Sequence, residues 1–536
     1  MGSGDPTPPT PAAHYQYRRT PRNRLWALLF ALAWVAAVVG GVYAIKHRNP
    51  AFIHLDYTDP ASCPAHPAAA RALLEALQEK HKGDWSPSQF VQFTGRWLAL
   101  SAGLALLLGV AFVKLFQHHA AAMTKATVAS QVAIPAAMAA VFLLNGQGTA
   151  GLVFGGLALL TAWVFSLWRQ QIQLATRLLG VSAHGLAANS GIITATVLLN
   201  LAALLAVLPL GAFLGFAVMN GSAIPNPERE GRAECVDAQG QEILCCSWQP
   251  NSFAQGYTAG AVVLILWVFL LANQVRVFVT SGAIAQWYFA PAGALSATRG
   301  TTLRSLKHAM GPSFGSLCLS SLVLTVSQIM RQALEQAQEN NRDMNLIQMC
   351  LVCLAQCFWS IVEYLTKFAT VMMAITGEAF LAAGRHVTDL LLRHFLNAFA
   401  STVWFTPLVI QLATFLLSAA WALVSGGSYY LAHRGSALEA TPGVNASVLG
   451  GAVFLVTFFI LSFLGGILLS VLDAVFVCWA IDLDSQTISQ PDVYAIFMAV
   501  PVPGRVVEQP DGDIAYGAGQ QQQGGGAYQP PTVAAV

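Results

Sequence analysis

Charged residues are scarce in this chain. Asp, Glu, Lys and Arg make up 10% of its 536 residues, whereas 55% are hydrophobic. A soluble domain carries about 25% charged residues and uses them to cover its surface. The composition therefore excludes an ordinary soluble protein. The formal net charge of +2 also argues against a nucleic-acid partner.

Long hydrophobic runs take the place of charge. Ten apolar stretches have about the length of 20 residues that crosses a bilayer. They lie at 25–45, 96–116, 123–144, 150–168, 193–219, 256–280, 311–331, 347–376, 395–425 and 447–478. We predict an all-α polytopic membrane protein of about ten transmembrane helices, with one membrane domain at 25–484.

The segments between the apolar stretches predict the orientation. Lys and Arg number fourteen on the side of the N-terminus and ten on the other side, which places both termini in the cytoplasm. Residues 1–24 and the Gly/Gln-rich residues 485–536 are then disordered cytoplasmic tails. The outer loops fall at about 46–95 and 220–255, and we expect the second to be irregular.

Cysteine usage follows this topology. Cys63, Cys235, Cys245 and Cys246 fall in outer loops, where disulfides persist, and the sequence leaves their three possible pairings open. Five further cysteines fall in the spans, where small apolar packing is the ordinary interpretation. The glycosylation sequons at Asn220 and Asn445 also fall in outer loops, each close to the end of a span.

Motifs for catalysis or cofactor binding are missing. The chain has no Ser/His/Asp arrangement and no phosphate-binding loop, and Gly146–Gly151 matches a dinucleotide fingerprint only in its letters, at a turn between spans. Cys350, Cys353 and Cys357 have no nearby histidine to complete a metal site. We therefore expect no enzyme activity, no cofactor and no bound metal.

The span at 347–376 carries a polar stripe. Its polar residues recur every three or four positions, which places them on one face of a helix: Gln356, Ser360, Glu363, Lys367 and Thr370. Glu363 and Lys367 also have the spacing of a favourable i,i+4 ion pair. If the helix spans, the stripe faces a polar cavity; if it lies at the inner surface, the stripe is solvated.

The last apolar run contains a single acid, Asp473. It lies 26 residues beyond Ser447, about 39 Å along a helix, whereas the hydrocarbon core is about 30 Å thick. We predict that Asp473 lies at the inner boundary and that the apolar residues after it pack against protein. Asp482 and Asp484 would close the run on the cytoplasmic side.

Several segments resemble the choline transporter-like family, mostly in the C-terminal half. They are Ala283–Phe289, Gly311–Leu317, Gln328–Arg331, Cys350–Lys367, Ala374–Phe380 and Leu472–Asp484. The resemblance implies a carrier of choline, with ethanolamine as a further candidate, in the plasma membrane or an organelle. The short first outer loop, Glu378 in place of a common basic residue, and the Gly/Gln-rich tail indicate a divergent branch.

For such a carrier we predict an aromatic cage for a quaternary ammonium, which binds ring faces through cation–π attraction. The cage candidates are Trp287, Tyr288, Trp359 and Tyr364, with Glu363 as counter-charge. Lys367 and Asp473 are supporting or gating charges, and alternating exposure of the cage moves the substrate.

Two alternatives from other functional classes stay open at this point. The first is a non-transporting membrane scaffold, in which Glu363 and Lys367 only neutralise each other. The second is a membrane-embedded lipid enzyme using His118 or His119, for which the sequence has no supporting motif.

Overall fold

A computed structural model describes most of the membrane domain and short segments beside it. The described residues are 14–50, 52, 87–167, 169–227, 235, 243–290, 300–340, 345–394, 396–434 and 442–498. Cys63, most of the first outer loop and the C-terminal tail after 498 lie outside them, so the predictions made there are not addressed by the structure.

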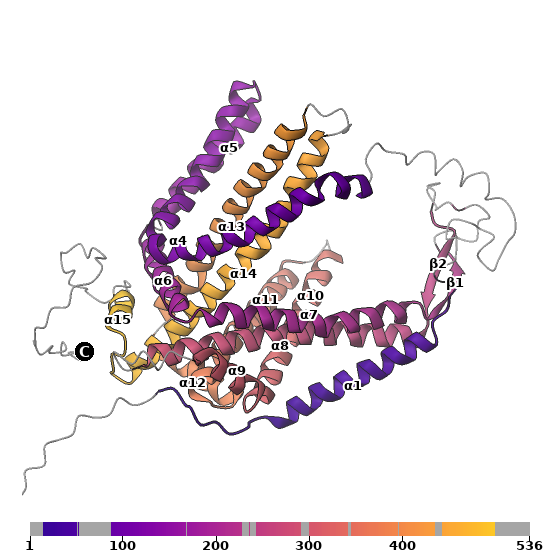
Figure 1. The fold of residues 1–536 in the computed structure, drawn as a ribbon. Helices are drawn as coiled ribbons and strands as arrows, with labels where there is room; N and C mark the ends of the chain where they lie inside the picture. The colour runs from indigo at the N-terminus through magenta and orange to yellow at the C-terminus, as the bar shows by residue number, and fades with distance from the viewer. Residues whose placement is uncertain are drawn as a thin grey trace, which may run out of the picture.

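Long helices dominate the described residues (Figure 1). They are α1 (Arg24–Lys46), α4 (Pro87–Leu144), α5 (Gly148–Leu167), α7 (Gly191–Val218), α8 (Ser252–Tyr288), α10 (Phe314–Asn340), α11 (Leu346–Thr376), α13 (Leu396–His433) and α14 (Pro442–Asp484). Helix α4 bends at His119, whose backbone leaves the helical region, and so comprises two spans, Thr94–Phe116 and Ala122–Leu144. The helices contain ten segments long and apolar enough to cross a membrane, at the predicted places, which confirms the all-α polytopic fold.

Four shorter helices follow the fourth, sixth, eighth and tenth spans: α6 (Arg169–Ala188), α9 (Thr301–Met310), α12 (Phe380–His394) and α15 (Pro491–Met498). Because antiparallel spans alternate in direction, these helices all belong to one end of the bundle. We call it the closed end. His14 approaches Thr487 there, with Nε2 and Oγ1 3.5 Å apart, so the first and last described segments meet at this end. Which side of the membrane it faces stays a prediction.

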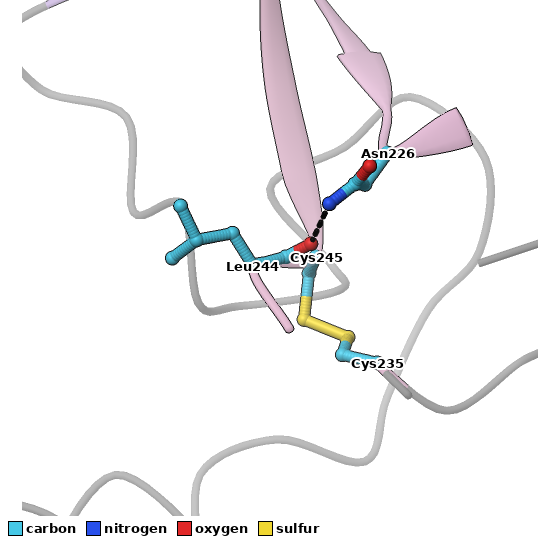
Figure 2. Close-up of a disulfide and its surroundings, with 4 residues drawn as sticks. All are labelled: Asn226, Cys235, Leu244 and Cys245. Carbon is cyan, nitrogen blue, oxygen red and sulfur yellow. Dashed lines mark hydrogen bonds between the residues drawn. A yellow bond between two sulfur atoms is a disulfide. The ribbon is translucent and has the colours of Figure 1, made fainter. Parts of the chain in front are cut away.

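The opposite end carries a small sheet that the sequence did not predict. Strands β1 (Gly221–Pro225) and β2 (Cys246–Pro250) pair antiparallel within the loop expected to be irregular, which corrects that expectation. Beside it, a disulfide joins Cys235 to Cys245, and the Asn226 side-chain amide donates to the Leu244 carbonyl at 2.8 Å (Figure 2). The structure thus selects one bond among the pairings that the sequence left open. We call this the hairpin end.

Burial is concentrated toward the closed end. In α11 none of the described side chains at 347–365 is buried, whereas every one at 368–375 is buried. Helix α14 is likewise buried without interruption from 470 to 480. In Figure 1 the helices α13 and α14 diverge from α1, α7 and α8 with distance from this end. The bundle is therefore packed shut at the closed end and much looser toward the hairpin end.

Asp482 ties the closed end together. Its fully buried carboxylate accepts hydrogen bonds from the Tyr288 hydroxyl at 3.1 Å and the Thr487 hydroxyl at 3.0 Å. The backbone N–H and the hydroxyl of Ser489 each donate at 2.8 Å. A buried carboxylate is stable only when donors replace its water, and these donors come from α8 and from the segment leading to α15.

Replacement of Asp482 with alanine should therefore destabilise the protein. It leaves buried donors without an acceptor, at a cost of about 2–4 kcal/mol. We expect a clear fall in the thermal unfolding midpoint of the purified protein in detergent. Asp492→Ala, at an exposed position in the first turn of α15, is the matched control and should leave the midpoint close to wild type. Equal midpoints for the two variants would contradict the role assigned to Asp482.

Candidate functional site

The polar stripe of α11 contacts three different helices, α8, α10 and α14. Helix α11 is 31 residues long and packs along α8 and α10. Both observations fit the first of the two sequence interpretations, in which this helix spans the membrane. Glu363 lies 13 residues before the last residue of α11, about 20 Å along the axis, and Lys367 about 14 Å. Both charges are therefore well inside the bundle, where each needs a partner.

Glu363 is bound by α10. Its Oε2 pairs with Nη1 of Arg331 at 2.9 Å, and its Oε1 accepts from the Ser327 hydroxyl at 3.1 Å and the Gln328 amide at 3.0 Å. The expected i,i+4 pair with Lys367 is not formed, because the donors of α10 occupy both carboxylate oxygens. This carboxylate is neutralised and fully hydrogen-bonded in the structure.

Lys367 instead pairs with Asp473 of α14. Its Nζ lies 2.5 Å from Oδ2 of Asp473, and the side-chain exposure is 35% for the lysine and 10% for the aspartate. The same ammonium is 6.0 Å from the centre of the Phe368 ring, within the range of cation–π attraction. A carboxylate and an aromatic face thus hold an ammonium group inside the bundle. We call Lys367, Phe368 and Asp473 the ammonium site.

Buried aromatic rings continue from this site toward the closed end. Phe368 contacts Phe476 with ring centres 6.2 Å apart, and Phe476 contacts Trp479 at 5.9 Å. All three rings are at most 4% exposed. The residues after Asp473 pack against protein as predicted, and the rings form a closed floor beneath the ammonium site.

Helix α8 contributes neighbouring polar groups. The Thr370 hydroxyl, one turn beyond Lys367, donates to Oε1 of buried Gln274 at 2.6 Å. Arg276 donates from Nη2 to Oδ1 of Asn273 at 2.5 Å, and Gly466 of α14 lies beside its guanidinium. The packed region near Lys367 therefore contains several polar groups. They come from α8, from α11 and from Asp473 of α14.

The predicted cage residues are not assembled into one site. Tyr288, at the last position of α8, is fully buried and donates to Asp482. Trp287 is beside it, facing His184 with ring centres 6.4 Å apart. Trp359 and Tyr364 lie on α11 near Glu363, and Tyr364 is 36% exposed. Gly282 of α8 lies beside Ala374 of α11, which is about 17 Å along the axis from Glu363, and Trp287 and Tyr288 lie more than one turn farther toward the closed end.

Sequence reasoning missed the partners across helices. Arg331, Ser327 and Gln328 lie on the helix before α11, and nothing in the sequence pairs them with Glu363 rather than with solvent. Phe368 went unnoticed because it is one phenylalanine among 29. The one available signal was the isolated Asp473, which required a cation somewhere in the bundle.

The remaining candidates have structural roles or different surroundings. Asn220 is 2% exposed and its side-chain amide donates to the carbonyls of Ala44 and Phe216, while Asn445 is 5% exposed, so burial argues against a glycan on either. Cys246 is buried beside the Cys235–Cys245 disulfide. Among the described residues, no three His, Cys, Asp or Glu side chains are grouped to hold a metal ion.

The sequence of this chain is similar to one known family of membrane proteins and to individual relatives. A sequence model described as plasma-membrane choline transporter matches residues 152–484. A CTL-like protein of Dictyostelium discoideum is 24% identical over 348 residues, 62% of each chain. Protein PNS1 of Yarrowia lipolytica is 21% identical over 66% of this chain and 60% of its own. Choline transporter-like protein 1 of Caenorhabditis briggsae is 26% identical over 33% of this chain and 23% of its own. The chain thus spans less than two thirds of these relatives.

The Glu363 network generates a stability prediction. Glu363→Ala leaves the Arg331 guanidinium without its carboxylate inside the bundle, which should cost about 1–3 kcal/mol. Replacing both residues with methionine removes both charges together and should recover most of the loss. Thermal unfolding of the purified variants measures this, with Glu339→Ala at an exposed position of α10 as control. A double variant no more stable than Glu363→Ala would contradict the pairing.

Proposed function

Because the chain belongs to the plasma-membrane choline transporter family, we propose that it transports choline or a related small organic cation. The family model covers residues 152–484, which include the spans that build the ammonium site. The relatives' names supply the substrate class, and the chemistry of the site must supply a reason for it. We place the protein in the plasma membrane on the same grounds.

One observation carries the proposal: the bundle already holds an ammonium group near both a carboxylate and an aromatic ring. This group belongs to Lys367, which pairs with Asp473 and lies 6.0 Å from the centre of the Phe368 ring. Choline presents a trimethylammonium group, which cannot donate a hydrogen bond and is recognised through charge and ring faces. The environment that stabilises the lysine is therefore the environment that a choline head group requires.

Of the two acids near the polar stripe of α11, Asp473 is a better counter-charge than Glu363. Glu363 is held by three donors from α10, so a cation without hydrogen bonds gains little by approaching it. Asp473 is paired with a single flexible ammonium, which is one-third exposed and can move aside. We infer that substrate competes with Lys367 for Asp473, and we keep Glu363 as a residue that joins α10 to α11.

The distribution of burial supports alternating access. The rings of Phe476 and Trp479 seal the bundle between the ammonium site and the closed end. Toward the hairpin end, α11 has no buried side chain among the described ones at 347–365. A substrate would reach the site from the hairpin end and leave after the floor opens. With the predicted orientation, this path runs from outside to inside.

An uptake assay can distinguish choline transport from two other functions, ethanolamine transport and a non-transporting scaffold. Ethanolamine is a smaller ammonium that donates hydrogen bonds, so it would pair directly with Asp473 instead of relying on the ring. A non-transporting scaffold would leave the Lys367–Asp473 pair permanently closed. Uptake of radiolabelled choline and ethanolamine into proteoliposomes separates these cases. Folded wild-type protein that takes up neither substrate would overturn the transport proposal.

If substrate and Lys367 compete for Asp473, removing the aspartate should weaken transport, whereas removing the lysine should strengthen substrate binding. Asp473→Asn removes the counter-charge and should lower choline uptake at least about tenfold. Lys367→Met removes the competitor, so KM should fall about tenfold, which corresponds to about 1.4 kcal/mol. Lys367→Arg retains a cation and should keep KM near wild type.

Two controls accompany these kinetics. His118→Ala alters an exposed side chain and should transport normally, which also tests the lipid-enzyme alternative. Thermal unfolding of each variant establishes that it is folded. An unchanged KM in folded Lys367→Met would contradict the competition.

A further inference from the structure

The segment before α1 crosses the closed end of the bundle. Residues 14–23 contain no helix or strand, yet they contact α8, α9, α10, the end of α11 and the segment just after α14. We call residues 14–23 the N-terminal strap. Its contacts are with the elements that an opening of this end has to separate.

Arg19 binds the C-terminal end of α11. Its Nη2 donates to the Ala374 carbonyl at 2.6 Å and its Nη1 to the Met373 carbonyl at 3.3 Å. The last carbonyls of a helix have no partner within the helix and carry its negative dipole end, so a guanidinium there is favourable in both respects. The backbone N–H of Gln16 donates to the Ile375 carbonyl at 3.1 Å. The strap therefore completes the end of α11.

The side chain of Tyr15, a residue of the strap, is buried against the bundle. It is 3% exposed, and its hydroxyl lies 3.3 Å from Nδ1 of His308 on α9. The Arg19 guanidinium stacks between the rings of Tyr15 and Phe278, 5.3 and 5.4 Å from their centres. One buried aromatic residue and one partly buried cation thus join α8, α9 and α11.

The two ends of the strap are also fixed. At its start, the rings of His14 and Phe289, just after α8, have centres 5.1 Å apart. At its end, the Asn23 amide donates to the Ser316 hydroxyl at 3.0 Å. The carbonyl oxygens of Arg22 and Asn23 lie so close to Gly315 that a Cβ at this position would overlap them. Glycine at 315 allows the strap to lie directly on α10.

We propose that the N-terminal strap is the gate of the closed end, docked while the site is open toward the hairpin end and released when the closed end opens. The proposal rests on the alternating access proposed above. Arg19, Tyr15 and Gln16 join α8, α9 and the end of α11, and His14 reaches Thr487, three residues after the end of α14. Helices α8, α11 and α14 enclose the ammonium site and its aromatic floor, and α8 and α11 cannot separate at the closed end while the strap holds them together. Release of the strap would expose the carbonyls at the end of α11 to water. Water molecules could then donate the hydrogen bonds that Arg19 and Gln16 had supplied.

Locking the strap tests whether its release is required for transport. Gln16→Cys and Thr376→Cys place thiols on neighbouring accessible residues, to be joined by a short bifunctional methanethiosulfonate. Cross-linked protein should lose choline uptake at least about tenfold and recover it with dithiothreitol. Choline should still raise its thermal unfolding midpoint, since the site stays open toward the hairpin end. Single-cysteine variants and reagent-treated wild type are the controls. Uptake within about twofold of the single variants would overturn the proposal.

Trypsin tests docking without a transport assay. Cleavage after Arg19 requires the strap to leave the bundle, so its rate reports the undocked population. Gly315→Ala should raise this rate about tenfold, because the new methyl group displaces the strap. Gly211→Ala, at a helical glycine with open space beside it, should not. Choline should accelerate cleavage of wild type in proteoliposomes by driving the cycle.

These results separate the two proposals. Wild-type protein that takes up no substrate removes the transport proposal, whereas the cleavage rates of Gly315→Ala and Gly211→Ala still report on the strap. Cleavage of wild type as fast as that of Gly315→Ala would show that the strap is not docked. Choline-independent cleavage in protein that does transport choline would show that the strap is docked but does not open in the cycle. Either result would overturn the gate.

Docking should also depend on pH in a defined range. Burial, with Arg19 and Arg304 nearby, lowers the pKa of His308 to about 4, below the ordinary value of 6.5. The charged and titratable groups around it are Tyr15, Arg19, Arg304 and Lys307. Undocked protein binds the proton more readily, so docking is full above pH 6.5 and weakens as pH falls toward 4. Cleavage of the strap by an acid-tolerant protease should rise over this range, and His308→Gln should abolish most of the rise.

Discussion

The structure depends on the requirement that every charge in the bundle has a partner. Three acids inside or at the rim of the packed region satisfy it in different ways. Glu363 is held by a cation and two neutral donors, Asp482 by neutral donors alone, and Asp473 by one lysine. Glu363 and Asp482 are fixed because several groups would have to move together to release them. The Lys367–Asp473 pair is the one among these that a competing cation can open by displacing a single side chain.

The pairing of Asp473 with a single lysine explains why a cation site need not be empty in the absence of substrate. An unpaired carboxylate in the bundle would cost several kcal/mol, and an empty cage would leave it unpaired. Lys367 removes that cost by acting as an internal cation, with Phe368 contributing its ring face. In the proposed mechanism, substrate binding would exchange one ammonium for another, so the electrostatic free energy would change little. Selectivity must come from the surroundings of the cation, where a trimethylammonium is larger and more apolar than a lysine head group.

Composition and periodicity were sufficient for the spans but not for the site. Ten membrane-length segments appear where hydrophobicity placed them, because bilayer thickness acts on each segment separately. The stripe on α11 was identified correctly, whereas the partner of Glu363 was wrong, since spacing along one helix says nothing about the residues of α10. Asp473 was recognised as an anchor at the packed end, but its cation came from a helix about 100 residues away. The helices α6, α9, α12 and α15 were missed because they are too short and too polar to resemble spans.

Helix α11 connects the two proposals physically. Lys367 lies six and seven residues before Met373 and Ala374, whose carbonyls Arg19 binds, about 9–11 Å along the axis. The helix is buried continuously from 368 to 375, where it packs against α8 and α14. A substrate that displaces Lys367 from Asp473 removes the charge pair that joins α11 to α14 in this region. The strap then remains as a polar link between α11 and the rest of the closed end, through Arg19 and Gln16, together with the Thr370–Gln274 hydrogen bond to α8. Charge exchange at the site and release of the strap are thus two steps that act on one helix, and the first weakens what the second must break.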